Sequence, residues 1–202
     1  MTILLALFFT LPLPEQESIV YETNDQGKMG KIVIDSRHDS LGYHIVYVSD
    51  RVIEAVLDTL NLKTLYLKKV IGGKLNIEIF NDRSYRVFYK DREKKYSNHD
   101  PIFDRHTLDF VLRGFELGPQ FKKRIRLSVP EFMVINADLE TVGEDTVQTP
   151  AGTFECWKLR LVPRVIFTKM KFYFWIEKEY PHRFVRYRDS SGKNQILLIE
   201  YR

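Results

Sequence analysis

Residues 149–187 read TPAGTFECWKLRLVPRVIFTKMKFYFWIEKEYPHRFVRY, and this segment decides the predicted fold. It opens with a turn, because Pro150 fixes a φ suited to the second position of a tight turn and Gly152 tolerates a positive φ. The residues after the turn alternate between the two sides of an extended chain. Trp157, Leu159 and Leu161 fall on one face, and Lys158 and Arg160 fall on the other. This alternation is typical of a β-strand, and the segment as a whole predicts three consecutive antiparallel strands.

The middle strand of the segment is apolar on both sides. Phe172, Phe174 and Ile176 share one side, and Tyr173 and Trp175 share the other. Such a strand is either covered on both faces within an ordinary core or has one face on an apolar cavity, and the first interpretation is favoured. If a cavity exists, we expect its apolar lining to be Trp157, Phe172, Tyr173, Phe174 and Trp175.

Length and composition favour one globular domain. The chain has 202 residues, 44% of them hydrophobic, and a formal net charge of only +4. A chain of this length can bury a sizeable core, and the weak, scattered positive charge gives no reason to expect a nucleic-acid partner. The single cysteine, Cys156, lies in the middle of a predicted strand and is interpreted as a core residue rather than a reactive thiol.

The N-terminus carries the main continuous apolar run. Residues 3–9 are too short for a membrane-spanning helix, which needs ~20 residues. They match the apolar centre of a secretion signal in length, although no Lys or Arg precedes them and Pro12 and Pro14 make an unusual cleavage region. Residues 1–14 are therefore predicted to be a signal peptide, with a first strand or helix as the alternative, and residues 15–202 to be a single β domain.

The rest of the chain continues the strand rhythm with one interruption. The spacing predicts one helix between residues 101 and 118, capped by Asp104, whose buried face holds Leu108, Val111, Leu112 and Phe115. Gly72-Gly73 predicts a tight hairpin. Residues 51–62 fit a strand or a helix, with the strand favoured, and residues 90–95 are interpreted as a charged edge or loop. The remaining predicted strands cover residues 18–23, 29–36, 43–49, 65–71, 75–79, 85–89, 122–129, 132–142, 145–148, 183–189 and 195–201.

This pattern predicts a mainly β protein with a strongly curved antiparallel sheet, or an open barrel, around one main helix. No arrangement predicts catalysis. His99, Asp100, Asp104 and His106 form the one local cluster of metal-type ligands, but Asp104 is better explained as a helix cap. Glu177 and Glu179 are interpreted as a solvated edge. A basic cluster after the helix is interpreted as a charged outer face, and it consists of Lys122, Lys123, Arg124 and Arg126. No catalytic residue, metal or cofactor is predicted.

Three segments together resemble a known group of proteins. They are VQTPAGTFECWKLRL at residues 147–161, FYFWIEKEYPHRFVRY at residues 172–187, and the helical DRHTLDFVLRGFELG at residues 104–118. The combination resembles an uncharacterised family of secreted bacterial proteins that look like the LolA/LolB lipoprotein carriers. The resemblance implies a curved sheet around a helix, a periplasmic or otherwise extracytoplasmic location, and a concave apolar surface for a lipid or an acylated protein.

Three functions remain open at this point. The favoured one is a non-catalytic envelope protein that binds or shuttles an apolar ligand, a lipid or lipoprotein, in a concave sheet. The second is a structural adaptor that pairs with another envelope protein through a sheet edge. The third is an enzyme, which would need His99, Asp104 and His106 to converge on a pocket.

Overall fold

A computed structural model of the chain describes residues 13–129, 133–165 and 170–202, which form one antiparallel sheet of fifteen strands around a single short α-helix. The apolar run at residues 3–9, interpreted above as part of a secretion signal, lies outside the described residues. Among the helices described, none is long and apolar enough to cross a lipid bilayer. The strands are β1 Gln16–Asp25, β2 Lys28–Asp39, β3 Gly42–Val48, β4 Arg51–Leu57, β5 Thr64–Ile71, β6 Lys74–Asn81, β7 Tyr85–Tyr89, β8 Arg92–Tyr96, β9 Ile102–Asp104, β10 Lys122–Val129, β11 Met133–Thr149, β12 Gly152–Pro163, β13 Phe172–Glu177, β14 Phe184–Asp189 and β15 Asn194–Tyr201.

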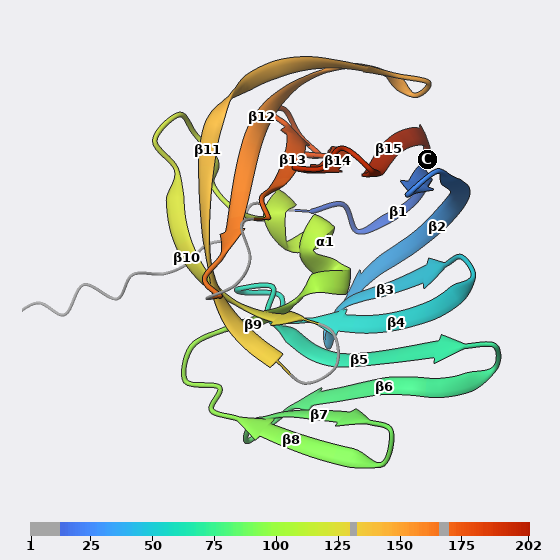
Figure 1. Cartoon of the computed structure of the whole chain (residues 1–202), viewed down its shortest axis with the longest axis vertical. Coiled ribbons are helices and arrows are strands. Elements are labelled where there is room, and N and C mark those ends of the chain that lie inside the picture. The colour runs from blue at the N-terminus through green and yellow to red at the C-terminus, as the bar shows by residue number, and fades with distance from the viewer. Residues whose placement is uncertain (1–12, 130–132, 166–169) are drawn as a thin grey trace, which may run out of the picture.

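The sheet is two meanders joined through the ends of the chain. Its order is β8-β7-β6-β5-β4-β3-β2-β1-β15-β14-β13-β12-β11-β10-β9, so the first and last strands pair in the middle. Every pairing is antiparallel except that of β9 with β10, which is parallel. Figure 1 shows the sheet bending strongly, so that the strands from β10 to β15 face the strands from β1 to β5 across the helix. The curved antiparallel sheet around one helix is the predicted architecture.

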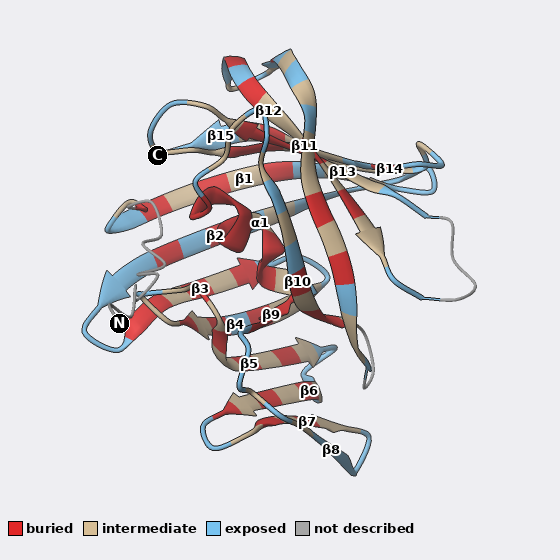
Figure 2. Cartoon of the chain, turned by 90° about the vertical axis from the view of Figure 1, so that its left-hand side faces the viewer, coloured by how far each residue is buried: buried red, intermediate tan, exposed pale blue. Residues whose placement is uncertain are grey.

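The helix is shorter than the sequence predicted. Residues 102–104 form the edge strand β9, a 3₁₀ turn follows at Arg105–Thr107, and α1 covers only Leu108–Arg113. Asp104 does cap this segment, because its side chain accepts a hydrogen bond from the backbone N–H of His106. Gly114 ends the helix, so Phe115 lies beyond it. Five of the six helical residues are buried, because the sheet surrounds α1 rather than lying against one face of it (Figure 2).

Several strand predictions are confirmed and one boundary is wrong. Gly72 and Gly73 both have positive φ and form the turn between β5 and β6, and residues 51–57 form a strand rather than a helix. Residues 133–149, predicted as two strands, form the single long strand β11. An extra residue at the register shift between Thr141 and Gly143 bends it without ending it.

This bend explains why β13 is apolar on both sides. We call the face of the sheet that is turned towards α1 the inner face, and the opposite face the outer face. Past the bulge, the β11–β12 hairpin arches over the sheet (Figure 1), and β11 there contacts β14 and β15. Val147, Phe154 and Cys156 on this hairpin are all buried. β13 is therefore covered on both faces from Phe174 to Ile176, whereas Phe172 and Tyr173 at its start are only partly buried.

A buried ion pair fixes the helix to the sheet. Arg113, at the end of α1, is 1% exposed, and Glu17 on β1 is 9% exposed. The Arg113 Nη1 and Nη2 atoms donate to the two carboxylate oxygens of Glu17, at 2.6 and 3.0 Å. Arg113 also donates to the backbone carbonyls of His182, at 3.1 Å, and Pro181, at 3.3 Å. One guanidinium therefore connects the helix, the first strand and the turn between β13 and β14.

A carboxyl group lies beside this pair on the same helix. The Tyr47 hydroxyl donates to Asp109 Oδ1 at 2.9 Å. Burial raises the pKa of Asp109 to about 6, and it outweighs the opposing effects of the Tyr47 hydrogen bond and the positive charge of Arg113. Burial also raises the pKa of Tyr47, and the negative charge of Asp109 adds to this effect. Asp109 therefore loses its proton on the helix only near pH 6.

The first prediction concerns the buried ion pair. Arg113→Met leaves the Glu17 carboxylate buried without a counter-charge, and we expect it to lower the free energy of unfolding by about 3–5 kcal/mol. The double variant Arg113→Met/Glu17→Leu should regain most of this loss. Arg51→Met removes an exposed pair with Asp50 and should cost less than about 1 kcal/mol. Urea denaturation of the four proteins measures the values. A loss at Arg113 no larger than that at Arg51 would contradict the anchoring role.

The second prediction concerns Asp109 and pH. Because its pKa is higher in the folded than in the unfolded chain, the folded state binds more protons, and stability falls as pH rises from about 4 to about 6. Asp109→Asn removes this effect. Its stability relative to the unsubstituted protein should therefore rise by on the order of 2 kcal/mol between pH 4.5 and pH 8.

The matched control is Asp50→Asn, because the hydrogen bonds from Arg51 lower the pKa of Asp50 to about 2. Both pKa values of Asp50, folded and unfolded, lie below pH 4.5, so the stability difference at this position should stay constant from pH 4.5 to 8. Denaturation midpoints of both variants at the two pH values test the contrast. A constant difference for Asp109→Asn would show that this carboxyl titrates normally.

Candidate functional site

The five aromatic residues predicted to line a cavity divide between the two faces of the sheet. In the pairing of β12 with β13, Leu161 lies opposite Phe172, and Leu159 lies opposite Phe174. Phe174 packs on Phe184, and Phe184 in turn packs on Tyr21, so these rings are on the inner face. Trp157 shares that face. Tyr173 and Trp175 pair with Arg160 and Lys158 on the outer face. One ligand surface can therefore use three of the five residues at most.

The inner-face residues form a continuous aromatic surface. The Phe172 ring stacks on Tyr187 with 6.3 Å between ring centres, and Phe174 lies 5.4 Å from the same tyrosine. Ile196 on β15 is the cross-strand partner of Tyr187 and is partly buried. Phe174 is buried, whereas Phe172 and Tyr187 are only partly buried. We call Phe172, Phe174, Tyr187 and Ile196 the inner aromatic surface.

The helix is too short to cover this surface along its whole length. A six-residue α-helix is ~9 Å long, whereas an eight-residue strand such as β15 spans ~27 Å. Arg113 fixes the C-terminal end of the helix at the other end of these strands, beside Glu17.

Burial raises the pKa of Tyr187 to about 12, and the negative charge of Asp189 adds to this while the positive charge of Arg105 opposes it. The phenol of Tyr187 is therefore neutral and behaves as part of an apolar surface.

Trp157 lies apart from this surface. It pairs with Ile176, four residues along β13 from Phe172, and the Nζ atom of Lys178 lies 4.6 Å from the centre of its ring. Lys178 in turn pairs with Glu144 on β11. The exposed side of Trp157 therefore contacts a charged side chain of the protein itself, which makes it a weaker candidate for ligand contact than Phe172.

Of the two outer-face aromatics, Trp175 is covered by the bent hairpin, whereas Tyr173 is only partly buried. The indole Nε1 of Trp175 donates to Asp145 Oδ2 on β11 at 2.7 Å. The Lys158 Nζ and Arg186 Cζ atoms lie 5.2 and 5.1 Å from the centre of the same ring, and these are cation–π distances. Trp175 is 6% exposed. Its role in the structure is to hold the β11–β12 hairpin against the sheet.

Two residues of the predicted histidine and aspartate cluster, Asp104 and His106, make a structural cap, whereas His99 and Asp100 are exposed. Asp104 Oδ1 lies 2.7 Å from His106 Nδ1 and accepts from the His106 N–H at 2.9 Å, and Thr64 Oγ1 accepts from the Asp104 N–H. Burial opposes the charge of Asp104, but His106 still lowers its pKa. His106 is largely covered, and Lys69 Nζ lies 3.4 Å from its Nε2. Across the described ranges, no three His, Cys, Asp or Glu side chains converge closely enough to hold a metal ion.

Two other sequence candidates are explained by packing. Cys156 is fully buried, and burial, followed by the negative charge of Glu177, raises the pKa of its thiol to about 12, which confirms its interpretation as a core residue. The interpretation of Glu177 as solvated is wrong. Its carboxylate pairs with Arg183 Nη1 at 2.8 Å, and both side chains are largely covered. The apolar surroundings of the β13–β14 turn favour this pairing, because an unpaired buried carboxylate would be costly.

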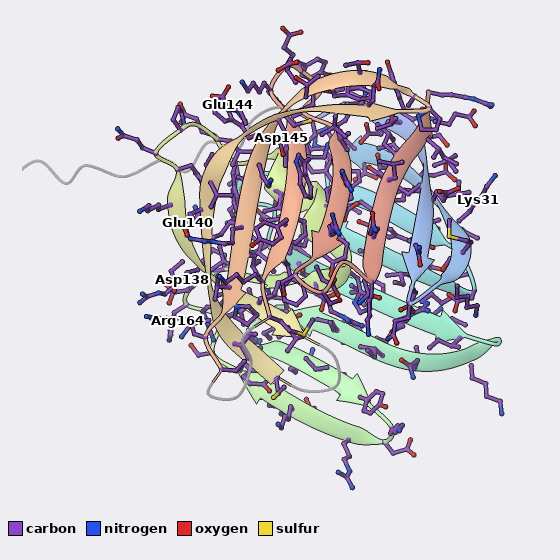
Figure 3. All side chains as sticks on the ribbon, turned by 45° about the horizontal axis from the view of Figure 1, so that its top comes forward. Lys31, Asp138, Glu140, Glu144, Asp145 and Arg164 are labelled. Carbon is purple, nitrogen blue, oxygen red and sulfur yellow. The ribbon has the colours of Figure 1, made fainter. Side chains whose placement is uncertain are left out.

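The basic cluster after the helix belongs to a network of ion pairs. Arg124 Nε lies 3.1 Å from Asp138 Oδ1, and Lys122 Nζ lies 3.7 Å from Glu140 Oε2. Arg164 reaches the other Asp138 oxygen at 3.1 Å, and Figure 3 shows Asp138, Glu140 and Arg164 along β11 and β12. The predicted charged outer face is confirmed for Lys122 and Arg124, where alternating signs on neighbouring strands account for it. Lys123 is instead partly buried, with its Nζ atom 4.8 Å from the centre of the Phe115 ring.

Solved structures with detectable similarity are distant. A protein described as exported, with a YmcC-like fold, from Bacteroides fragilis is 16% identical with a TM-score of 0.36, and the match covers 96% of this chain and 99% of the other. A lipoprotein from Parabacteroides distasonis is 10% identical with a TM-score of 0.35, over 96% and 99% of the two chains. MucB in the MucA/MucB complex of Pseudomonas aeruginosa is 13% identical with a TM-score of 0.36.

The match with MucB covers 93% of this chain but only 51% of the MucB chain, so this chain spans about half of that protein. At such identities and TM-scores, none of these structures supports an argument about function. A comparison with curated proteins finds no significant match. The family comparison is more decisive, because one family model matches residues 15–199, nearly the whole chain. The chain therefore belongs to the DUF3108 family of proteins of unknown function.

Proposed function

We propose that this protein is a non-catalytic binding protein of the bacterial cell envelope that holds the apolar part of a lipid or an acylated protein against the inner aromatic surface. The observation that carries the proposal is the half-buried pair Phe172 and Tyr187, whose rings stack on the inner face of the sheet. Soluble proteins tend to keep such apolar surface covered, and partial exposure on a concave face is typical of a binding surface.

The chemistry of this surface fits an apolar chain better than a polar ligand. Phe172, Phe174 and Ile196 contribute only carbon atoms, and Tyr187 is held in its neutral form. An acyl chain gains ~0.8 kcal/mol for each methylene group that it buries. Lys171, next to Phe172 in the sequence, is exposed at the end of β13 and would suit the anionic headgroup of such a ligand.

The envelope location rests on the sequence. The apolar run at residues 3–9 has the length of a signal-peptide centre, and the turn and hairpin segments resemble a family of secreted bacterial proteins related in fold to lipoprotein carriers. A carrier of this kind would need a surface that takes up and releases an acyl chain, and the partial burial of Phe172 and Tyr187 is compatible with that.

A second function, a structural adaptor, is favoured by one feature of the sheet. Strand β8 ends the strand order, so only β7 pairs with it in the described part of the chain. Four of its five residues are exposed. An unpaired strand edge can accept an extended segment of another protein, although lysines on an edge also discourage such pairing. Cross-linking of an envelope protein through β8, with no lipid on the inner face, would favour the adaptor over the carrier.

The third prediction tests the carrier by using adjacent residues on opposite faces. Phe172→Ser removes a ring from the inner aromatic surface, and Tyr173→Ser removes a ring of similar size from the outer face. Titration with a fluorescent C12 fatty acid should show that Phe172→Ser weakens binding about tenfold or more, because several buried methylene contacts are lost. Tyr173→Ser should bind as the unsubstituted protein does.

Native mass spectrometry of the protein purified from a bacterial envelope fraction is the companion measurement. A bound mass matching a lipid, lost in Phe172→Ser and retained in Tyr173→Ser, is the expected result. Equal binding by both variants, or no bound lipid together with no fatty-acid affinity, would contradict the proposed function.

A further inference from the structure

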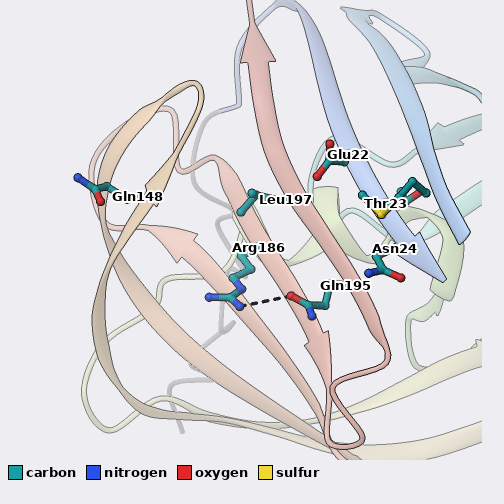
Figure 4. A pocket seen from close by; sticks show the side chains of 8 residues that line it. Glu22, Thr23, Asn24, Gln148, Arg186, Gln195 and Leu197 are labelled. Atoms are coloured by element: carbon teal, nitrogen blue, oxygen red, sulfur yellow. Dashed lines mark hydrogen bonds between the residues drawn. The ribbon is translucent and has the colours of Figure 1, made fainter. Parts of the chain in front are cut away.

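A hollow of about 250 Å³ lies on the outer face, away from the inner aromatic surface. Its floor comes from β14, β15, β1 and β2, and the β11–β12 hairpin closes one side. Figure 4 shows Arg186, Leu197 and Glu22 following one another across neighbouring strands. The lining consists of two opposite charges, three carboxamides, a hydroxyl and two apolar side chains, which are Glu22, Arg186, Asn24, Gln148, Gln195, Thr23, Met29 and Leu197.

The strand register sets the spacing of the charges. Arg186 lies opposite Leu197, and Leu197 lies opposite Glu22, so the three form one row across the sheet. Neighbouring strands are ~4.8 Å apart, which puts the Cα atoms of Arg186 and Glu22 ~10 Å apart with an apolar residue between them. The next row places Gln195 beside Asn24 and Met29. The floor therefore has a cationic end, an apolar middle and an anionic end.

The wall of the hollow is held in place before any ligand arrives. Gln148 lines the hollow from the hairpin. Asp145, on the same strand, accepts from Trp175 Nε1 at 2.7 Å and lies 3.2 Å from Lys158 Nζ, and Glu144 pairs with Lys178. A hollow whose wall is already fixed loses less conformational entropy on binding than one formed by a free loop.

Both charged groups of the floor keep capacity for a partner. Arg186 Nη2 donates to Gln195 Oε1 at 3.4 Å, and its guanidinium lies over Trp175, which orients it and leaves further N–H donors. Lys31 is the cross-strand neighbour of Glu22. Within the described ranges, neither Glu22 nor Arg186 forms a direct ion pair. The hydrogen bond from Trp175 and the charge of Lys158 lower the pKa of Asp145, and the charge of Arg186 reaches this carboxyl and adds to their effect.

We infer that this hollow binds a small zwitterionic molecule, with its ammonium group at Glu22, its carboxylate at Arg186 and an apolar portion over Leu197. A phosphate or a simple anion would meet the repulsion of Glu22, and a simple cation would meet that of Arg186. Asn24 Oδ1 already accepts from the Gly27 N–H, and Gln195 already contacts Arg186 and the Gly192 carbonyl. The Gln148 carboxamide and the Asn24 amino group remain to bond an amide between the two charges. This inference does not depend on the proposed function of the inner aromatic surface.

A free amino acid and a short peptide share this chemistry. The separation of the two charges across three strands favours a peptide of two or three residues. A second hollow shares Asn24 with the first and continues along the β1–β2 turn, lined further by Gln26, Gly27, Gly192 and Lys193. A peptide would have room to extend there, whereas an amino acid would leave it empty.

The fourth prediction tests the hollow with the tripeptide alanyl-leucyl-alanine by isothermal titration calorimetry on the full chain. We expect measurable binding that is lost when the peptide is N-acetylated or C-amidated. Glu22→Gln and Arg186→Gln should each weaken binding about tenfold, because each removes one charge-assisted contact. Glu54→Gln and Arg37→Gln make the same changes at exposed positions outside the hollow and should leave binding unchanged.

Free leucine distinguishes the two sources of the ligand. Binding as tight as that of the tripeptide would identify an amino acid, and weaker binding would identify a peptide. Because Arg186 also packs on Trp175, the stability of Arg186→Gln is compared with that of the unsubstituted protein by urea denaturation. If Arg186→Gln proves unstable, the conclusion rests on Glu22→Gln. Equal binding of the free and blocked peptides, an unchanged affinity in Glu22→Gln, or no binding of either ligand would overturn the inference.

Discussion

The contact on which the rest of this structure depends is the buried pair between Arg113 and Glu17. The sheet of fifteen strands curls because both of its halves bury apolar residues of the inner face in one core, and the ion pair fixes how the halves sit around the helix. The Arg113 guanidinium does this from the helix, because it reaches both β1 and the carbonyls of the β13–β14 turn. A buried ion pair is seldom the most stabilising choice, but it specifies a single position for the helix.

That position determines which surfaces of the sheet are covered. The helix occupies the end of the concave face near Glu17, and the aromatic residues Phe172 and Tyr187 continue beyond it. On the other side, the bulge near Gly143 lets the β11–β12 hairpin arch over the outer face and seal Trp175. The same strand, β13, therefore contributes to a closed core on one face and to a partly open aromatic surface on the other. This difference underlies the proposed binding function.

The sequence predicted the class of fold and many strand positions because alternation and turn residues are local signals. The hairpin at Gly72-Gly73 and the turn at Pro150 are examples, and period-two alternation already required Phe172 and Tyr173 to lie on opposite faces. The helix was predicted too long, because its apolar spacing continues to Phe115 although pairing with β10 draws residues 102–104 into a strand. The Arg113–Glu17 pair joins residues 96 positions apart, and no local pattern indicates such a partner.

The outer hollow could not be predicted from the sequence either, because its lining comes from five strands and depends on the arch of the hairpin. Two residues of the inner aromatic surface, Phe172 and Phe174, were predicted from the sequence. Alternation alone could not show which elements cover each face of their strand.

Binding of an acyl chain to the inner aromatic surface is tested most directly by a nuclear Overhauser experiment. The protein is saturated with a fatty acid that carries a 13C-labelled acyl chain. If the acyl chain lies on the inner aromatic surface, cross-peaks should join its methylene protons to the ring protons of Phe172 and Tyr187. Cross-peaks confined to Tyr173 would place the acyl chain on the outer face and contradict binding at the inner aromatic surface.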